Sequence, residues 1–577
     1  MRVNLPVGLT KLVNKMEKKE EAQVKTNNPA KSDTLSFMSI PSIAFTGKLV
    51  VPKLPKGMKA SPDPVLSKDS AAYLNKLEKE PTFKYLAYPQ DPLVTPEPEL
   101  YSVKGEVVPG PESNRIKINH HSEKAQPSAN GNYIADVNTP QFDRVNVFAF
   151  TQKVLNMYEQ ALGRKIHWAF NSEQLKSDPL AGVTMNAYYS RNEQTTKFFY
   201  FDSRTNPTEK CYTSKMADVV THETGHATLD GLRPSYIGWG HHGGAIHEGF
   251  SDTTAMLVAM ENDTVLDKVI EQTKGDLRKE NLIASLAEQF GKAVYGDKLY
   301  LRNAINELTL GDYNSGRESK QVHNFGRLLA GTNYSILSEM TMYHEGALTL
   351  KGALKKSKED FTKILARAMG DFSPPGNVYY NDVGKAILKA ASVEFNGVYK
   401  DMVKKVLLER EILTVKEVGD WEAEQAAMPK LSLPPKVLDS KETVLDFVNR
   451  NKELLGLPLD SKYELESAYS NNFGETFIQL KAGKMIEVPP KDPMDDPTYR
   501  IRIYGGLTLA FDKEGKLFYK AENKTHGFEI QDAIEDAQNV LSKQKEAHIA
   551  GAKPVVYREN NNDNVLVKIP KIEDPIN

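Results

Sequence analysis

Apolar residues recur at the spacing of a helix over residues 144–163, in the stretch RVNVFAFTQKVLNMYEQALG. Gly163 ends this stretch, and glycine commonly follows the last turn of a helix. Two runs rich in aromatic and branched residues come next, GVTMNAYYS at 182–190 and TKFFYFD at 196–202, and they predict strands. From residue 215 to about 415 most segments again have helical spacing, so the centre of the chain is predicted to be mainly helical.

Prolines mark two breaks in this pattern. Six prolines fall within residues 88–112, and such a stretch predicts an extended linker or wrapping arm rather than a helix. The second break is AAMPKLSLPPKVLDS, residues 426–440. After it comes one helical stretch and then YGGLTLAFDKEGKLFYKAE, residues 504–522, where alternating apolar positions around a turn at Asp512–Gly515 predict a β-hairpin. The stretch EIQDAIEDAQNVLSKQ, residues 529–544, predicts a closing helix.

A chain of 577 residues is too long for one hydrophobic core, so several domains are expected. The mixture of helical and strand segments predicts the α+β class. We expect a disordered polar tail at residues 1–45, a proline-rich extended arm at 46–129, the main domain at 130–428 and a small α/β domain at 436–577.

Composition argues against several classes of function. The net charge of −2 gives no basic surface for nucleic acid, and no run of about 18 apolar residues predicts a transmembrane helix. Cys211 is the single cysteine, so no disulfide framework is expected and we predict a buried, inert thiol. Asn4 and Pro6 interrupt the apolar residues at the N-terminus, so no secretory signal is predicted. This favours the cytoplasm by default, with export by a route that needs no signal peptide as the alternative.

Five of the twelve histidines lie between residues 222 and 247, and two of them belong to DVVTHETGHATLD, residues 218–230. His222 and His226 are four residues apart, so on a helix both side chains point to the same side. Neutral imidazoles are good zinc ligands, and a catalytic zinc usually has three protein ligands and a water. Glu223 follows the first histidine and could act on that water as the general base.

A third ligand has to come from elsewhere in the chain. Leu232 excludes the zinc peptidases that place a third histidine six residues after the second. The stretch GGAIHEGFSD, residues 243–252, supplies Glu248 instead, and Asp252 follows four residues later on the same helical face. A zinc-bound histidine usually donates its other N–H to a carboxylate. We therefore predict Glu248 as the third zinc ligand and Asp252 as the carboxylate behind His222.

His247 is a rival ligand, but adjacent helical residues point about 100° apart, so His247 and Glu248 cannot both face one metal. The four-residue spacing from Glu248 to Asp252 favours the glutamate. His241 and His242 lie in the glycine-rich stretch GWGHHGG. That stretch predicts exposed loop histidines at the rim of the site rather than a second metal site.

The combination of DVVTHETGHA with GAIHEGFSD closely resembles the thermolysin-like zinc peptidases and their fungalysin relatives. The resemblance covers about residues 130–415. It implies a two-lobed catalytic domain, in which a strand-rich lobe precedes a helical lobe and a zinc ion lies in the cleft. It also implies hydrolysis of peptide bonds in peptide or protein substrates.

Further site residues follow from this resemblance alone. The stretch MNAYYS resembles the edge strand of the family, which implies that Asn186 and Ala187 contact the substrate backbone; an ordinary strand is the alternative. Val219 falls where the family lines the pocket for the residue after the scissile bond, which implies an apolar preference. Asp218 matches a position that binds structural calcium in the family. This allows a calcium site, although the sequence does not reveal the other acidic ligands.

Attack of water on a peptide carbonyl forms an oxyanion, which needs a fixed donor as well as the metal. Members of the family use a downstream histidine for this. His323 in QVHNFGRLLAGT is the candidate here, and a structural histidine is the alternative. Arg327 either meets a substrate carbonyl or carboxylate or forms a surface ion pair. Tyr236 and Tyr313 are further candidate donors.

The C-terminal segments also resemble parts of this family. VLDFVNRNKELLGLPLDSKYELESAYS and RIRIYGGLTLAFDKEGKLFYKAE resemble the propeptide domain of fungalysin and thermolysin precursors, and EIQDAIEDAQNVL resembles the first helix of the adjoining PepSY unit. In the family these segments precede the catalytic domain, whereas here they follow it. The resemblance implies a domain that acts in cis on the active site, by inhibition or by substrate capture. A helix-plus-hairpin domain unrelated to propeptides is the alternative.

These observations predict a zinc metalloendopeptidase that hydrolyses peptide bonds by zinc-activated water, with Glu223 as the general base. Two alternatives stay open. One is a catalytically silent scaffold with the same fold, against which the intact Glu223 argues, because that residue has no metal to bind. The other is a zinc-dependent hydrolase that acts on something other than peptides.

Overall fold

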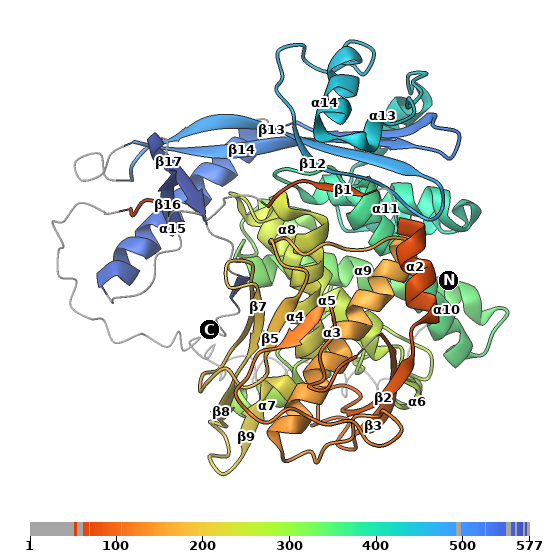
Figure 1. The fold of residues 1–577 in the computed structure, drawn as a ribbon, viewed down its shortest axis with the longest axis vertical. Coiled ribbons are helices and arrows are strands. Elements are labelled where there is room, and N and C mark those ends of the chain that lie inside the picture. Colours follow the sequence, from red (N-terminus) through yellow and green to blue (C-terminus); the bar gives the residue numbers. More distant parts are fainter. Residues whose placement is uncertain are drawn as a thin grey trace, which may run out of the picture. The chain divides into compact units, whose positions relative to one another are not determined.

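The fold is that of a computed structural model (Figure 1). The structure describes residues 51–54, 62–67, 70–105, 107–491, 498–524, 527–549, 556–559, 562–568 and 572–573. The tail predicted at residues 1–45 lies outside the described residues. Helices and strands are both abundant in the described part, as expected for a protein of mixed α and β structure.

The region predicted as a proline-rich arm contains regular structure. Its elements are β1 (Val65–Ser67), α2 (Ser70–Lys79), β2 (Thr82–Ala87), β3 (Glu99–Lys104) and β4 (Ile116–Ile118). Strands β2 and β3 form an antiparallel pair. The prolines lie between and after these two strands, where a missing N–H disrupts no ladder. The alternation of exposed and buried positions in β3, with Tyr101 and Val103 buried, is the strand pattern that the proline content obscured.

A long buried helix and a five-stranded sheet follow. Helix α3 (Pro140–Leu162) ends where Gly163 adopts a left-handed conformation with φ of 66°, so the predicted helix and its stop signal are confirmed. The predicted strand segments are confirmed as well. The sheet has the order β18-β6-β7-β5-β4, and β8 pairs with β9 beside it. The bounds of these strands are β5 (Leu175–Asp178), β6 (Ala187–Ser190), β7 (Thr195–Phe198), β8 (Tyr200–Asp202), β9 (Lys210–Tyr212) and β18 (Ile572–Glu573).

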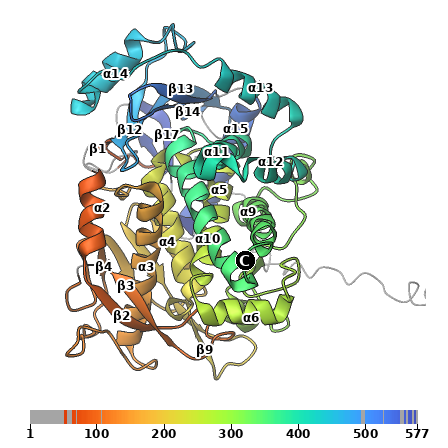
Figure 2. The same ribbon diagram turned by 90° about the vertical axis from the view of Figure 1, so that its right-hand side faces the viewer.

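The predicted helical region between residues 215 and 415 is confirmed. Helix α5 packs against both α4 and α9, all three are buried along most of their length, and α10 packs on α9. These helices are labelled in Figure 2. Two short strands, β10 (Ser285–Leu286) and β11 (Arg302–Asn303), pair within this region. The helices are α4 (Ala217–Leu232), α5 (His241–Ala259), α6 (Asp263–Thr273), α7 (Glu288–Tyr295), α8 (Leu310–Asn314), α9 (Val322–Glu345), α10 (Leu350–Arg367), α11 (Tyr380–Val393), α12 (Lys400–Glu409) and α13 (Val415–Ala426).

The C-terminal part is built on a second, larger sheet. Its strand order is β1-β12-β13-β14-β17-β16, with β15 also paired to β14, so β1 from the N-terminal region completes one edge. Strands β13 and β14 are the two long blue arrows of Figure 1. The predicted hairpin is confirmed as β14 and β15, because the Asp512 N–H donates to the Lys516 carbonyl at 2.9 Å. The elements are α14 (Lys441–Arg450), β12 (Glu464–Ser470), β13 (Thr476–Val488), β14 (Tyr499–Phe511), β15 (Leu517–Asn523), α15 (Gly527–Ile549), β16 (Val556–Glu559) and β17 (Asn562–Lys568).

This second sheet shares a hydrophobic core with the helices that precede it. Tyr469, Phe477, Ala510 and Tyr519 from its strands belong to the same buried apolar cluster as α3, α4, α5 and α11. Phe372, in the turn that follows α10, packs edge-on against Phe477 and Tyr519. The break near residue 430 therefore divides the sequence, but the segments on its two sides share one hydrophobic core.

Buried ions join the same two segments. Arg367 at the end of α10 lies 2.5 Å from Asp371, 3.0 Å from Glu394 and 2.6 Å from Glu475, which precedes β13. Arg233, after α4, donates to the Gln479 side chain on β13 at 2.7 Å. Removal of the second sheet would take Glu475 from Arg367 and Gln479 from Arg233, and would expose to water the apolar surface that the two segments bury together.

Candidate metal centre

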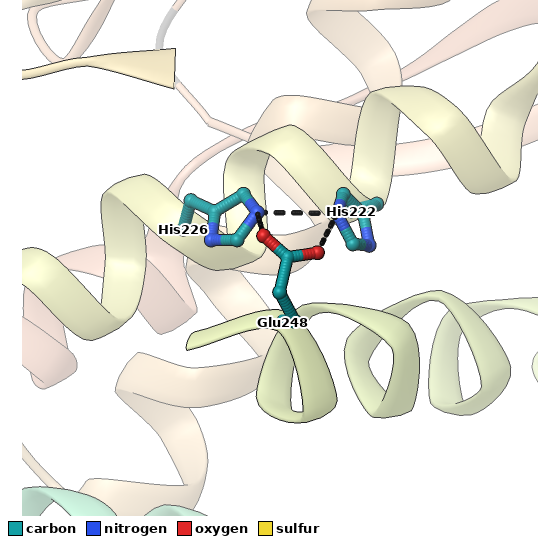
Figure 3. Close-up of side chains that lie close together, drawn as sticks. All are labelled: His222, His226 and Glu248. Carbon is teal, nitrogen blue, oxygen red and sulfur yellow. Dashed lines mark hydrogen bonds and ion pairs between the residues drawn. The ribbon is translucent and has the colours of Figure 1, made fainter. Parts of the chain in front are cut away.

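Two helices bring three ligand atoms to one point. His222 and His226 project from one side of α4, and Glu248 faces them from α5 (Figure 3). The Nε2 atoms of the two histidines are 3.1 Å apart. The carboxylate of Glu248 places one oxygen 3.5 Å from His222 Nε2 and the other 3.5 Å from His226 Nε2. All three side chains are buried.

This arrangement fits a metal ion with tetrahedral coordination. Zinc binds histidine nitrogen and carboxylate oxygen at about 2.0–2.2 Å, so two ligands in a tetrahedral site lie about 3.3 Å apart. The distances within this triangle of side chains are close to that spacing: 3.1 Å between the two Nε2 atoms, and 3.5 Å from each Nε2 to a different oxygen of Glu248. Both oxygens of Glu248 are buried and accept no hydrogen bond from the part of the chain that the structure describes. A buried carboxylate in that state needs a cation beside it, and the donor set of two imidazoles and one carboxylate suits zinc.

Asp252 lies behind the first histidine, on the side away from the other two ligands. Its carboxylate is 2.9 Å from Nδ1 of His222, which fixes the imidazole with its Nε2 toward the cluster. Arg302 on β11 binds the same carboxylate at 2.9 Å. Burial by itself would raise the pKa of Asp252, but Arg302 and His222 hold it below its ordinary value. Asp252 is therefore an anion that orients His222.

Arg302 was missed by the sequence analysis. It lies 80 residues from His222 in sequence, yet its guanidinium is 3.4 Å from that imidazole. The stretch KLYLRNAIN around it has no spacing that ties it to the histidines. The short pairing of β10 with β11 brings Arg302 to α4.

A pocket with largely apolar walls opens beside the ligands. Glu223 and His222 line it together with Arg302, and its apolar lining includes Ala187, Val219, Leu286, Phe290 and Leu301. Two of the residues singled out for substrate contact, Ala187 and Val219, therefore lie at this pocket. Asn186 directly precedes β6, and its backbone carbonyl accepts a hydrogen bond from Thr213 at 3.4 Å.

His323 reaches the cluster from a third helix. It lies in the first turn of α9, and its Nε2 is 3.7 Å from Glu248 Oε1. The other candidate donors are engaged elsewhere. The hydroxyl of Tyr236 contacts Ser373, the hydroxyl of Tyr313 donates to the Asn324 carbonyl at 2.7 Å, and Arg327 donates to the Asn324 side chain at 2.9 Å.

The other histidines considered in the sequence, at positions 241, 242 and 247, lie in different environments. His247 is buried against His226, and neither of its nitrogens has a hydrogen-bond partner. Burial lowers the pKa of His247 to about 3, so this ring is neutral. The expectation of exposed loop histidines at 241 and 242 was wrong, because α5 begins at His241. His242 is buried among aromatic rings, including those of Phe325 and Tyr380.

Cys211 is buried on β9, and burial raises the pKa of its thiol. The prediction of an inert, buried cysteine is confirmed for its position. A low thiol pKa is the condition for a reactive cysteine, and this environment has the opposite effect.

A second group of acidic side chains lies at the start of α4. Asp91, Asp218 and Glu288 are buried, and their carboxylates place oxygens within 4.8 Å of one another. Backbone N–H groups donate to two of them, Ala287 to Asp218 at 2.6 Å and Gln289 to Asp91 at 2.8 Å. Both oxygens of Glu288 are buried and accept no hydrogen bond.

The pKa values of this acidic group are raised, so its ionised form would be stabilised by a cation. Burial, followed by the neighbouring charge of Asp218, raises the pKa of Asp91 to about 8. Burial raises the pKa of Asp218 and of Glu288 as well. Oxygen ligands from several carboxylates are what Ca²⁺ prefers. Asp218 was singled out from the sequence, whereas Asp91 and Glu288 were not, because they come from segments far away along the chain.

The last described strand lies along β6. Strand β18 pairs antiparallel with β6, with Ile572 opposite Tyr189 and Glu573 opposite Tyr188. Since β7 occupies the other edge of β6, β18 fills the edge that would otherwise be open. Its direction runs toward Ala187, which lines the pocket.

No protein-family model matches the sequence, and no curated protein matches it. Among solved structures, the fold is similar to the precursor of protealysin, a metalloproteinase from Serratia proteamaculans. The TM-score is 0.35 and the identity 14%, over 52% of this chain and 87% of that chain. A TM-score this low marks a remote likeness, so the chemistry has to be inferred from the side chains themselves. Within the described residues, no helix is long and apolar enough to cross a membrane.

Substitution of Gly326 on α9 tests how tightly the centre is held. A Cβ at this position would lie 2.4 Å from the Cβ of Glu248 and 3.0 Å from the Ala245 carbonyl oxygen. We expect Gly326→Ala to push Glu248 out of place, to weaken zinc binding and to destabilise the fold by about 1–3 kcal/mol. Zinc content and urea unfolding measure the two effects. Gly346→Ala, directly after the end of the same helix, is the control, because the nearest neighbour of the added Cβ would be 3.8 Å away. Full zinc content in Gly326→Ala would contradict the assignment of Glu248 as a metal ligand held in place by this contact.

Proposed function

We propose that this chain is a zinc-dependent metalloendopeptidase, with His222, His226 and Glu248 as the zinc ligands. The observation that carries the proposal is the buried triangle of two imidazoles and one carboxylate, in which neighbouring side chains place nitrogen and oxygen atoms 3.1–3.5 Å apart, beside a pocket that also contains Glu223. A zinc ion held there would polarise the substrate carbonyl and lower the pKa of a water molecule.

The side chains around the triangle then have separate tasks. Glu223 accepts a proton from the attacking water and returns it to the leaving amine, as a general base and then a general acid. His323, whose Nε2 lies 3.7 Å from Glu248 Oε1, donates a hydrogen bond to the oxyanion. Asp252, held by Arg302, keeps the Nε2 atom of His222 directed at the metal.

The substrate in this proposal is a peptide in extended conformation. Val219 and its apolar neighbours in the pocket accept the side chain that follows the scissile bond, which gives a preference for apolar residues. Asn186 and Ala187 at the start of β6 bind the substrate backbone. The proposed catalytic domain, residues 130–428, has two lobes, with the sheet around β6 in one and the helices from α5 onward in the other.

Replacement of the general base separates catalysis from metal binding. The wild-type protein should contain about one zinc per chain and cleave a casein-type substrate, with loss of activity in a chelator. Glu223→Gln should keep its zinc and lose about 10²–10⁴-fold in kcat, because only the proton acceptor is removed. Glu271→Gln, on the exposed face of α6, is the matched control.

The same experiment discriminates the alternatives. A catalytically silent scaffold binds zinc and cleaves nothing. A hydrolase of another class binds zinc and leaves peptides intact while it cleaves other substrates, such as esters. A Glu223→Gln variant that hydrolyses peptides as fast as the wild type would refute the mechanism.

We further propose that Asp91, Asp218 and Glu288 bind a structural calcium ion. Three buried carboxylates in mutual contact repel one another, and a divalent cation would offset that repulsion. Because Asp218 lies one turn before His222 on α4, a cation there would also fix the helix that carries two zinc ligands.

Calcium should stabilise the wild type, and Asp218→Asn should abolish that effect. Ligand at 100 times its Kd stabilises a fold by about 2.7 kcal/mol, which corresponds to a shift of several degrees in Tm. Thermal unfolding of zinc-loaded protein with CaCl₂ or MgCl₂ measures both effects, and Asp267→Asn on the surface of α6 is the control. An equal calcium shift in Asp218→Asn would disprove the site.

The C-terminal segment acts in cis in this proposal, through β18. Extended peptides commonly bind by adding a strand to an open sheet edge. Strand β18 occupies that edge of β6 at Tyr188 and Tyr189, next to Ala187. Residues 572–573 therefore compete with a substrate that extends along β6, and their attachment to the chain gives them a high effective concentration.

A chain that ends at Lys568 tests this competition, since it keeps β17 and lacks β18. For long peptide substrates we expect a KM several-fold lower and an unchanged kcat. For short substrates that do not reach β6 we expect no change in KM. The peptide PKIEDPIN, residues 570–577, should restore the higher KM when added in trans, and a scrambled peptide should not. A KM that is the same for the full and the shortened chain would disprove inhibition by β18.

A further inference from the structure

The helix that carries Glu248 begins without a cap of its own. The first N–H groups of any helix lack intrahelical partners and need acceptors from elsewhere. At the start of α5 the capping position is Gly240, which has no side chain to accept them. The negative charge that this helix end favours must therefore come from another part of the chain.

Helix α15, far away in sequence, supplies that charge. The Gly240 N–H donates to the Asp536 carboxylate at 2.9 Å, and the His241 N–H donates to the Asp532 carboxylate at 2.9 Å. The other oxygen of Asp532 is 2.8 Å from Nδ1 of His241. Both aspartates are buried. They are four residues apart, so both project from the same face of α15 onto the end of α5.

The close approach of the two helices depends on Gly240. Its φ is +107°, a conformation that residues with a Cβ avoid, and a Cβ there would lie 2.8 Å from Asp532 Oδ2. The glycine-rich stretch before α5 therefore has a packing role, which is to admit a carboxylate from α15 to the backbone.

The first turns of α5 transmit this contact to the metal ligand. Glu248 is seven residues after His241, about two turns along the helix. Between them, Gly243 packs so closely on Tyr236 that a Cβ would lie 2.0 Å from its carbonyl oxygen, and His242 packs on the ring of Phe325. A segment packed in this way moves as one body. The hydrogen bonds to Asp532 and Asp536 at its start therefore help to fix Glu248.

We propose that Asp532 and Asp536 are positioning residues of the metal centre, which hold α5, and through it Glu248, in the geometry that binds the metal. The inference rests on the proposed zinc site. It makes α15 a permanent part of that site, in contrast to β18, which a substrate displaces.

The contact between His241 and Asp532 depends on pH. The hydrogen bond to Asp532 raises the pKa of His241 above its ordinary 6.5, and the nearby charges of Asp536 and Lys568 act on the ring in opposite directions. Burial opposes the ionisation of Asp532, but His241 holds its pKa below its ordinary 3.8. The ion pair is therefore complete between these two pKa values. It weakens as pH rises through the pKa of His241 and as pH falls through that of Asp532.

Zinc affinity of the full-length chain measures the proposed role. We expect Asp532→Asn and Asp536→Asn each to raise the Kd for zinc about three- to tenfold, and the double variant to raise it further, because loss of a helix cap weakens the first turn by that order. Glu535→Gln removes the same charge from the exposed face of α15 and should leave the Kd unchanged. Competition with a chromophoric chelator gives the Kd values without an activity assay.

The pH profile distinguishes positioning from a general loss of stability. The ratio of the Kd of Asp532→Asn to that of the wild type should be largest near pH 6 and should shrink above the pKa of His241. Amide hydrogen exchange at residues 240–244 should be faster in Asp532→Asn. Asp536→Asn is a second test that leaves the pair of His241 with Asp532 in place, although it also removes the ion pair of Asp536 with Lys568 at 3.0 Å. Wild-type zinc affinity and unchanged exchange in both variants would overturn the inference. A wild-type chain that binds no zinc would overturn the proposed function instead.

Discussion

The close packing of α4, α5 and α9 is the constraint on which the site depends. Two imidazoles and a carboxylate can share one metal only if their helices approach closely, and glycines permit this approach. A Cβ at Gly225 on α4 would lie 2.9 Å from the Cα of Ser251 on α5. Gly326 on α9 plays the same part opposite Glu248. Because the ligands are buried, water cannot solvate the charge of Glu248, and the proposed zinc ion would compensate it.

Helix α4 connects the two proposed metal sites. Asp218 in its first turn belongs to the acidic group, and His222, one turn later, belongs to the zinc triangle. The acidic group also joins this helix to a segment before the proposed catalytic domain, through Asp91, and to a later segment within it, through Glu288. A change of charge at one site would therefore be felt at the other through the position of the same helix.

The C-terminal sheet and helix α15 contribute to the main core and to the start of α5, in addition to the proposed inhibition by β18. Arg367 places its guanidinium among three carboxylates, one of them from the start of β13, and four residues of the second sheet lie in the main core. Helix α15 caps α5, and β1 from the N-terminal region pairs with β12. These contacts make the folding of the proposed catalytic region dependent on residues that are synthesised after it.

The sequence by itself determined the features that depend on short spacings. Helix periodicity places His222 and His226 on one face and puts Asp252 one turn after Glu248, and turn residues located the β14–β15 hairpin and the end of α3. Only the tertiary structure decided the rest. Arg302 reaches the site through β11, Asp91 and Glu288 join Asp218 from distant segments, and Asp532 caps α5 from the last helix. Such contacts form when the whole chain buries its apolar faces, and no local pattern of residues specifies which distant charge will compensate a buried one.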